Sequence, residues 1–255
     1  MLVLWDIDHT LIENNGVNKE TYAEAFELLT GRRAAHRAET DGRTEPEIMR
    51  NMLAAHAIDV PDGFPARVIM ALETVTLANA PRLRERGHEL PGARETLAAF
   101  QDLPCIVRSV LSGNTKSNAL TKLSAFGLHG YLDLEVGGYG SDDDVRVKLV
   151  RVAQLRASEK YGHEFGPDST VLIGDTPRDV RTGLEGGLMV WAWLRGPAAW
   201  MSCCWRARTL PCLIFVILRR WWMLSCGFSG RRGEKPGCFH GGCALLPEPG
   251  FLDRG

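Results

Sequence analysis

The chain has 255 residues, of which 45% are hydrophobic and 24% charged, and its formal net charge is -1. This length allows one large domain or two modest ones with a substantial core. A charge so close to zero gives no electrostatic attraction to nucleic acid or an anionic membrane surface, so we expect neither as a partner. Cys105 is the only cysteine before residue 203, which excludes a disulfide framework from the main body. The apolar segment that begins at residue 2 leaves no room for a secretory signal, so we expect a cytoplasmic protein.

That first apolar segment, Leu2–Trp5, runs directly into two aspartates. Short continuous apolar runs are typical of buried strands in a parallel sheet. Alternate side chains of an extended segment share a face, so we expect Asp6 and Asp8 to face one pocket at the strand's carboxyl end, with Ile7 opposite. Two carboxylates so close indicate a divalent cation or a division of acid and base roles. The alternative is a strand that ends in a solvated turn, with Thr10 as a cap.

Residues 15–88 show helical patterns and no convincing strand. Apolar residues recur at helical spacing after Lys19, and Pro46 marks the first turn of a second helix. A third, longer helix follows the turn that ends at Gly63. We therefore expect this block to be a helical insertion between the first strand and the return of the chain to the sheet.

The rest of the main body alternates strands with helices. Further strands are expected at residues 106–111, 132–136, 170–173 and 188–194, with a turn at residues 137–140. Helical patterns with short connections separate these strands, which predicts an α/β fold with a doubly wound, mostly parallel sheet. The carboxyl ends of such strands lie at one edge of the sheet, so the polar residues that follow them are expected to converge there.

Three segments carry a family resemblance. Residues 6–11 (Asp-Ile-Asp-His-Thr-Leu), 111–114 (Leu-Ser-Gly-Asn) and 173–179 (Ile-Gly-Asp-Thr-Pro-Arg-Asp) resemble the first, second and fourth motifs of the haloacid dehalogenase superfamily of phosphatases. The resemblance covers residues 1–187, and the phosphoglycolate phosphatase-like members are the most similar in kind. It implies a Rossmann-like core of residues 1–14 and 89–195 and an inserted α-helical cap of residues 15–88, which would close over the site and select the substrate.

The resemblance also implies roles for the acidic residues. Asp6 would be the nucleophile that forms an aspartyl phosphate, and Asp8 would protonate the leaving oxygen and then activate water. Mg²⁺ would be held by the Asp6 and Asp175 carboxylates, the Asp8 carbonyl and waters. Asp179 would support this metal site, either directly or through the residues around it.

Phosphate binding is implied for the second motif. Ser112 would hold a phosphoryl oxygen, helped by the backbone N–H groups of Gly113 and Asn114, whereas the alternative role of Ser112 is a simple helix N-cap. The family also uses a lysine at the phosphoryl group. Lys122 matches the Lys-Leu pair of members with a Gly-Asn second motif, and Lys116 and Lys148 compete for the role.

The expected substrate is a small phosphate ester, of the phosphoglycolate or sugar-phosphate type. Arg43, in an Asp-Gly-Arg-Thr turn of the cap, is a candidate for binding a substrate carboxylate or second anion, with a solvated turn arginine as the alternative. His9 stands where glycine is commoner in the family and is a candidate for substrate contact, not for catalysis. A phosphomutase and a non-catalytic, metabolite- or partner-binding relative are the alternative functions.

Residues 196–255 have a different composition from the rest. They hold most of the cysteines and show no sustained periodicity, so we expect an atypical tail, either frameshifted or disordered. Cys238, His240 and Cys243 match no common zinc spacing. The apolar run at residues 210–218 is far shorter than the ~20 residues needed to cross a bilayer, so no membrane anchor is expected.

Overall fold

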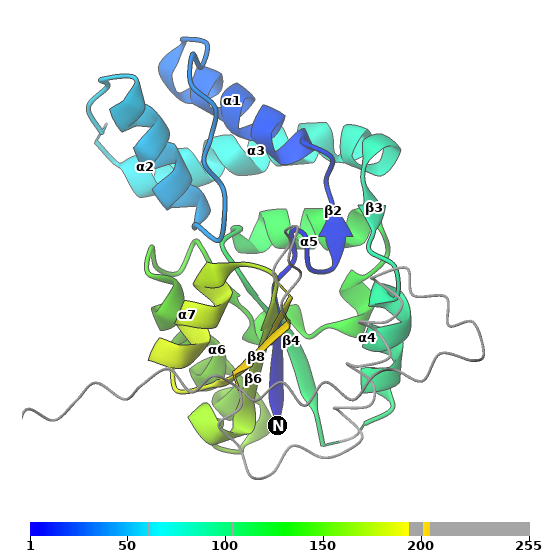
Figure 1. Cartoon of the computed structure of the whole chain (residues 1–255). Helices are drawn as coiled ribbons and strands as arrows, with labels where there is room; N and C mark the ends of the chain where they lie inside the picture. The colour runs from blue at the N-terminus through cyan, green and yellow to red at the C-terminus, as the bar shows by residue number, and fades with distance from the viewer. Residues whose placement is uncertain (61, 104, 194–200, 205–255) are drawn as a thin grey trace, which may run out of the picture.

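The computed structural model describes residues 1–60, 62–103, 105–193 and 201–204. Two layers are visible in Figure 1, an α/β core and a group of helices above it. The core holds a sheet with the strand order β5-β4-β1-β6-β7-β8. These strands are β1 (Leu2–Trp5), β4 (Val107–Ser112), β5 (Gly138–Tyr139), β6 (Thr170–Gly174), β7 (Met189–Trp193) and β8 (Met201–Cys204).

The central strand β1 pairs in parallel with β4 on one side and with β6 on the other. Its last residue, Trp5, lies opposite Val110 and Ile173 in this register, so the three strands end close together. The pairs β4–β5 and β6–β7 are also parallel, and only β8 runs antiparallel to its neighbour. The residues after β1, β4 and β6 are therefore delivered to one edge of the sheet.

Helices cover both faces of this sheet, and β1 is consequently apolar at every position. Val3 and Trp5 pack with residues of α4 (Ala93–Gln101) and α5 (Lys116–Ala125). Leu2 and Leu4 point to the opposite face and pack with residues of α6 (Arg146–Tyr161), beside which lies α7 (Pro177–Glu185). A strand that is buried on both faces has no polar side, which explains the continuous apolar run in the sequence.

The helices above the sheet form a cap with its own hydrophobic core. They are α1 (Val17–Thr30), α2 (Glu45–Ala55) and α3 (Phe64–Arg86). Phe26, Met49 and Leu72 are fully buried among them. The chain enters and leaves the cap through a two-stranded antiparallel ribbon, β2 (Ile12–Glu13) and β3 (His88–Glu89). This ribbon is the covalent connection between cap and core.

The fold class predicted from the sequence is confirmed, and two local predictions are wrong. The third strand is β5, not residues 132–136, and it occupies part of the predicted turn at 137–140. Residues Leu134–Val136 form the short 3-10 helix η2; η1 (His129–Tyr131) and η3 (Pro167–Ser169) are of the same kind. The ribbon strands β2 and β3 have no counterpart in the sequence analysis, because two-residue strands carry no periodic signal.

Strand β8 lies within the segment that the sequence analysis assigns to an atypical tail, and it adds an antiparallel edge to the sheet. The predictions for Cys238, His240 and Cys243 and for residues 210–218 concern segments that lie outside the described residues. Within the described part of the chain, no helix combines the length and apolarity that crossing a membrane requires.

Candidate active site

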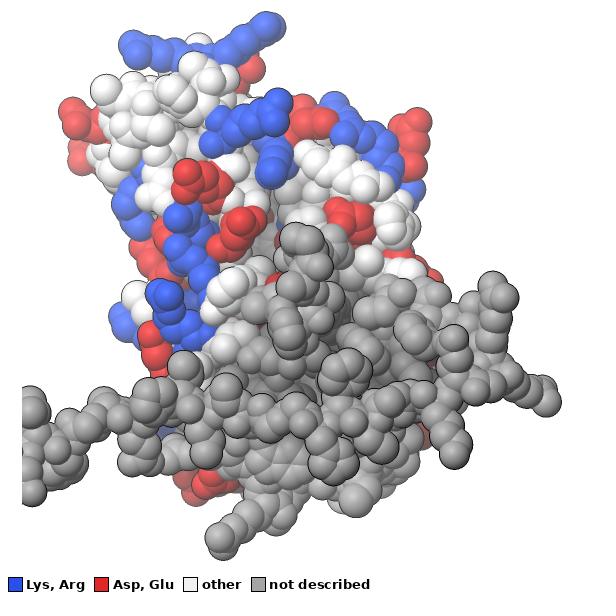
Figure 2. All heavy atoms as spheres, in the orientation of Figure 1, with Lys and Arg blue, Asp and Glu red and all other residues white. Residues whose placement is uncertain are grey.

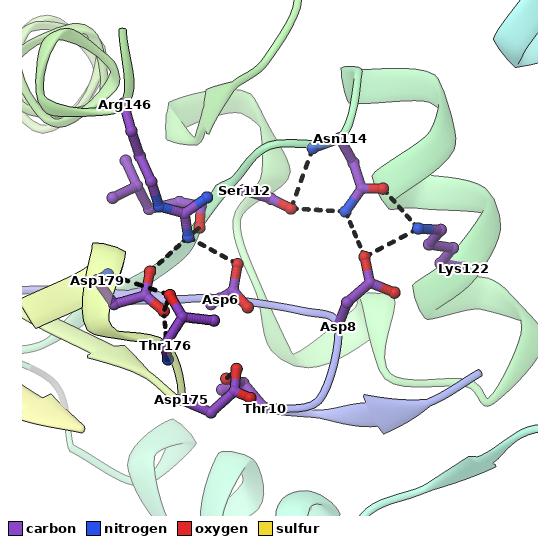
Figure 3. Close-up of polar contacts among 11 residues, drawn as sticks. Asp6, Asp8, Thr10, Ser112, Asn114, Lys122, Arg146, Asp175, Thr176 and Asp179 are labelled. Atoms are coloured by element: carbon purple, nitrogen blue, oxygen red, sulfur yellow. Dashed lines mark hydrogen bonds and ion pairs between the residues drawn. The ribbon is translucent and has the colours of Figure 1, made fainter. Parts of the chain in front are cut away.

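A cavity of about 540 Å³ lies between the cap and the carboxyl ends of β1, β4 and β6. The core lines it with Asp6, Asp8, Ser112 and Asp175, and the cap with Asn18 and Arg43. The predicted residues after the strands therefore do converge, as the topology requires. Figure 3 shows these residues of the core with their polar neighbours, among them Asn114, Lys122 and Arg146.

Asp6 is buried at the carboxyl end of β1, and its carboxylate pairs with a cation from the face of the sheet that α6 covers. Its Oδ1 lies 2.8 Å from Nη2 of Arg146, which also lies 2.6 Å from Oδ1 of Asp179. Burial raises the pKa of Asp6 to about 7, although the Arg146 guanidinium opposes this shift. Near pH 7 the Asp6 carboxyl group can therefore bind a proton, and a metal ion that bound there would displace it.

Asp8 also lines the cavity, but its cation comes from the opposite side of the sheet. Its Oδ2 accepts hydrogen bonds from Lys122 and Asn114, each at 2.9 Å. Burial alone would raise the pKa of Asp8, but the Lys122 ammonium and the hydrogen bonds from Asn114, Lys122 and Asn18 lower it to about 2. Strand β1 stops at Trp5, so Asp6 and Asp8 lie beyond it. The regular alternation of side chains along a strand therefore does not determine their directions.

Within the part of the chain that the structure describes, one group of acids could hold a metal ion. Single carboxylate oxygens of Asp6, Asp175 and Asp179 lie within 4.8 Å of one another, and all three residues are buried. An all-oxygen donor set of this kind fits Mg²⁺. Thr10 donates to Asp175 at 3.1 Å, and Thr176 fixes Asp179 through its backbone N–H and its hydroxyl. The Asp8 carboxylate does not belong to this group; the sequence analysis assigned its carbonyl to the metal.

The loop after β4 is arranged around Ser112. Its Oγ accepts hydrogen bonds from the backbone N–H and the side-chain amide of Asn114, at 3.3 and 2.7 Å. The N-cap of α5 is Thr115, which accepts from Asn118 N at 3.2 Å, so the simple N-cap role for Ser112 is wrong. Ser112 and Gly113 both line the cavity.

The structure separates the three candidate lysines. Lys122 is only 3% exposed and its Nζ contacts Asp8 and Oδ1 of Asn114, at 2.9 and 2.6 Å. Lys116 pairs with Glu135 and Lys148 with Asp143, and both are surface lysines. Of the three candidates, Lys122 is therefore the one whose ammonium contacts an acid of the site.

Arg43 and His9 both line the cavity. Arg43 lies 2.9 Å from Glu39 and 3.3 Å from Glu47, so its charge is shared with two carboxylates. His9 has φ of 65°, in the left-handed region that favours glycine. Its Nδ1 lies 3.0 Å from Glu13.

The sequence analysis missed Arg146. It is the first residue of α6 and is only 8% exposed, although its neighbours in the sequence are mostly charged. One signal was present: a cation in the first turn of a helix opposes the helix dipole, which requires a compensating anion nearby. The compensating anions are Asp6 and Asp179.

Polar contacts fasten the cap to the core around the cavity. The backbone N–H of Glu45, at the start of α2, donates to the carbonyl of Gly113 at 2.8 Å. The buried Glu45 carboxylate accepts from Thr115 N and Asn118 Nδ2, both at 2.8 Å. Arg50 of the cap pairs with Asp144 of the core at 2.7 Å. Figure 2 shows basic and acidic side chains interspersed where the two layers meet.

The family comparison agrees with this geometry. A model of the family described as haloacid dehalogenase-like hydrolase matches residues 3–183, which include every acid and cation placed at the site. The chain belongs to the haloacid dehalogenase-like hydrolase family. Among curated proteins, the sequence comparison finds no match.

Solved structures confirm the fold of this haloacid dehalogenase-like hydrolase. CbbY from Rhodobacter sphaeroides in complex with phosphate is 14% identical, with a TM-score of 0.54, covering 80% of this chain and 90% of that one. A mutant of the same protein in complex with xylulose-(1,5)bisphosphate is 14% identical, with a TM-score of 0.55 and coverages of 76% and 86%. A predicted phosphatase from Clostridium acetobutylicum is 14% identical, with a TM-score of 0.51 and coverages of 74% and 82%.

Proposed function

We propose that this hydrolase is a magnesium-dependent phosphatase of small phosphorylated metabolites, and that it works through an aspartyl phosphate on Asp6. The observation that supports this most is the arrangement of two carboxylates in one cavity. Asp6 lies against Arg146 and the acid group, while Asp8 lies against Lys122 and Asn114. Two acids with different environments are suited to two roles, one as nucleophile and one as acid and base.

Mg²⁺ would be held by the carboxylates of Asp6 and Asp175 and the carbonyl of Asp8. Asp179 would support this site, either directly or through the residues around it. When bound, the ion supplies positive charge that lowers the repulsion between a phosphate ester and the attacking carboxylate. Ser112 and the loop N–H groups would bind phosphoryl oxygens, and Lys122 would neutralise charge on the same group.

Asp8 would transfer the protons. In this arrangement it is ionised, which is the form that activates water when the phosphoenzyme is hydrolysed. A dianionic phosphoryl group bound to Lys122 would weaken the contacts that lower the Asp8 pKa. Asp8 would then take up a proton from solvent and transfer it to the leaving oxygen in the first step, which leaves Asp8 ionised for the activation of water.

The substrate would be of the phosphoglycolate or sugar-phosphate type. The printed ligands of CbbY, phosphate and xylulose-(1,5)bisphosphate, support a phosphate ester in this class of fold. The cavity of about 540 Å³ accommodates a molecule of that size, and Arg43 is placed on the cap side of it. A cytoplasmic location stays a prediction.

The test is hydrolysis of an aryl phosphate by the purified full chain, with and without Mg²⁺, beside the variant Asp6→Asn. We expect activity that needs both Mg²⁺ and Asp6. Hydrolysis in ¹⁸O-water separates the phosphatase from a phosphomutase, because only the phosphatase incorporates the label into free phosphate. Folded wild-type protein that is inactive toward a broad set of phosphate esters would favour a non-catalytic binding role.

A further inference from the structure

The cap donates a hydrogen bond to Asp8. Asn18, in the first turn of α1, donates from Nδ2 to Oδ1 of Asp8 at 2.7 Å. The other oxygen, Oδ2, accepts from Asn114 and Lys122, which both belong to the core. The carboxylate is therefore held through Oδ2 by the core, and through Oδ1 by a short hydrogen bond from the cap and a longer one, at 3.3 Å, from Asn14.

We propose that Asn18 is a positioning residue that orients Asp8 toward the leaving group, and that it does so only when the cap is docked on the core. This inference rests on the proposed function, because it requires Asp8 to be the acid. It adds a residue of the cap to the catalytic step and makes cap docking a condition for leaving-group protonation.

The local chain geometry explains how Asn18 reaches Asp8. Asn14 accepts from Gly16 N at 3.0 Å, and Gly16, with φ of 85°, turns the chain into α1. The first turn of α1 then brings Asn18 to Oδ1 of Asp8. Nδ2 of Asn14 lies 3.3 Å from the same oxygen of Asp8. Strand β2 lies between Asp8 and Asn14, in the ribbon that connects the layers. A rotation of the cap about this ribbon would move Asn18 relative to Asp8.

The docked position depends on contacts far from Asp8 in the sequence. The Glu45 contacts with Gly113 and Thr115 and the Arg50–Asp144 pair hold the start of α2 against the core. Helix α1 packs on α3 and α2 within the same cap, so these contacts also fix where Asn18 lies. The hydrogen bond to Asp8 is thus a property of the docked cap.

Loss of Asn18 would leave the charge partner of Asp8 in place. Lys122 and Asn114 would still contact Oδ2, but Oδ1 would keep only the longer hydrogen bond from Asn14, so the orientation of the carboxylate would be less restrained. Protonation matters most for a basic leaving group, such as an alkoxide, and little for a weakly basic one, such as 2,4-dinitrophenolate. The dependence of rate on the leaving group therefore separates a positioning role from general loss of structure.

The experiment compares kcat/KM, which covers the steps up to leaving-group departure, for alkyl, phenyl and 2,4-dinitrophenyl phosphates. The variants are Asn18→Leu and Asn18→Ala, which both remove the amide donor, the first at similar volume. The matched control is Asn79→Leu, because the buried Asn79 amide bonds Thr21 and Glu24 inside the cap and does not line the cavity. Thermal unfolding and Mg²⁺ affinity are measured for every variant.

We expect both Asn18 variants to lose about 10²-fold with alkyl phosphates and less than about threefold with 2,4-dinitrophenyl phosphate, in line with the usual contribution of a general acid. Asn79→Leu is expected to change all substrates by one common factor. An equal loss for every leaving group in the Asn18 variants, or no loss, would overturn the proposal. Wild-type protein without Asp6-dependent hydrolysis of any of these esters would overturn the proposed function as well.

Discussion

The Arg146 guanidinium and the Asp6 carboxylate form an ion pair in which Nη2 and Oδ1 lie 2.8 Å apart, with side chains only 8% and 10% exposed. The same nitrogen contacts Asp179, so one cation compensates two acids of the proposed metal site. Because solvent screens this pair little, its charge balance matters both for stability and for metal binding.

The first prediction concerns that balance. Arg146→Met should destabilise the metal-free protein by about 3–5 kcal/mol, because it leaves buried carboxylates without their cation. Mg²⁺ would replace part of the missing charge, so it should raise the melting temperature more in this variant than in wild type. Thermal unfolding with and without Mg²⁺ tests this, with Arg151→Met, on the exposed face of the same helix, as the control. An equal Mg²⁺ effect in the variant and wild type would refute it.

A second prediction separates the lysines. Lys122→Met should lower aryl phosphate hydrolysis about 10²- to 10³-fold, since a donor at the reacting group is removed from a buried position. Lys116→Met and Lys148→Met should stay within about twofold of wild type, because both lysines are paired at the surface. Steady-state kinetics of the three variants test this prediction. A loss in either surface variant as large as that in Lys122→Met would contradict the role assigned to Lys122.

A third prediction follows from the raised pKa of Asp6, which burial brings to about 7. Mg²⁺ needs the ionised carboxylate, so a proton competes with the metal below that pH. The apparent Mg²⁺ affinity should fall about tenfold for each pH unit below about pH 7 and level off above it.

Isothermal titration calorimetry tests this in buffers that differ in ionisation enthalpy, between about pH 6 and about pH 8, where proton release should accompany binding on the acid side. Asp6→Asn should bind Mg²⁺ more weakly and show a flatter pH profile. An affinity that does not change with pH in wild type would count against the raised pKa.

A fourth prediction addresses cap docking. A methyl group on Gly113 would collide with the carbonyl oxygen of Arg43 in the cap, so Gly113→Ala should hold the cap away from the core. We expect faster protease cleavage around residues 31–44 and a fall in kcat/KM of about tenfold or more, since small displacements in an active site are costly. Gly130→Ala, whose added methyl meets no atom within 4 Å, is the control. Wild-type cleavage rates in Gly113→Ala would exclude this account.

Sequence reasoning predicted the fold and the convergence of the acids because both follow from chain order. Asp6, Ser112 and Asp175 each follow a buried parallel strand, and parallel strands that end together bring such residues to one edge. No knowledge of side-chain packing is needed for that step. Lys122 was one of three candidate lysines, chosen through a local sequence match, and its Nζ lies 2.9 Å from Asp8.

Features that depend on packing were not predictable in the same way. Strand β5 is only Gly138–Tyr139, and it forms because β4 offers a free edge at Leu111 and Ser112. Residues 132–136 gave a stronger strand pattern, but Leu134–Val136 form the 3-10 helix η2 instead. Arg146 and Asn18 likewise lie on helices, and their contacts with Asp6 and Asp8 depend on how those helices dock.

The most direct test of the account is the detection of a phosphoenzyme. Rapid quenching of the Mg²⁺-loaded protein during turnover, followed by borohydride reduction, would convert an aspartyl phosphate into homoserine, which peptide mass spectrometry can locate. We predict homoserine at position 6 in wild type and none in Asp6→Asn. Homoserine at another aspartate, or efficient turnover by Asp6→Asn, would contradict the account.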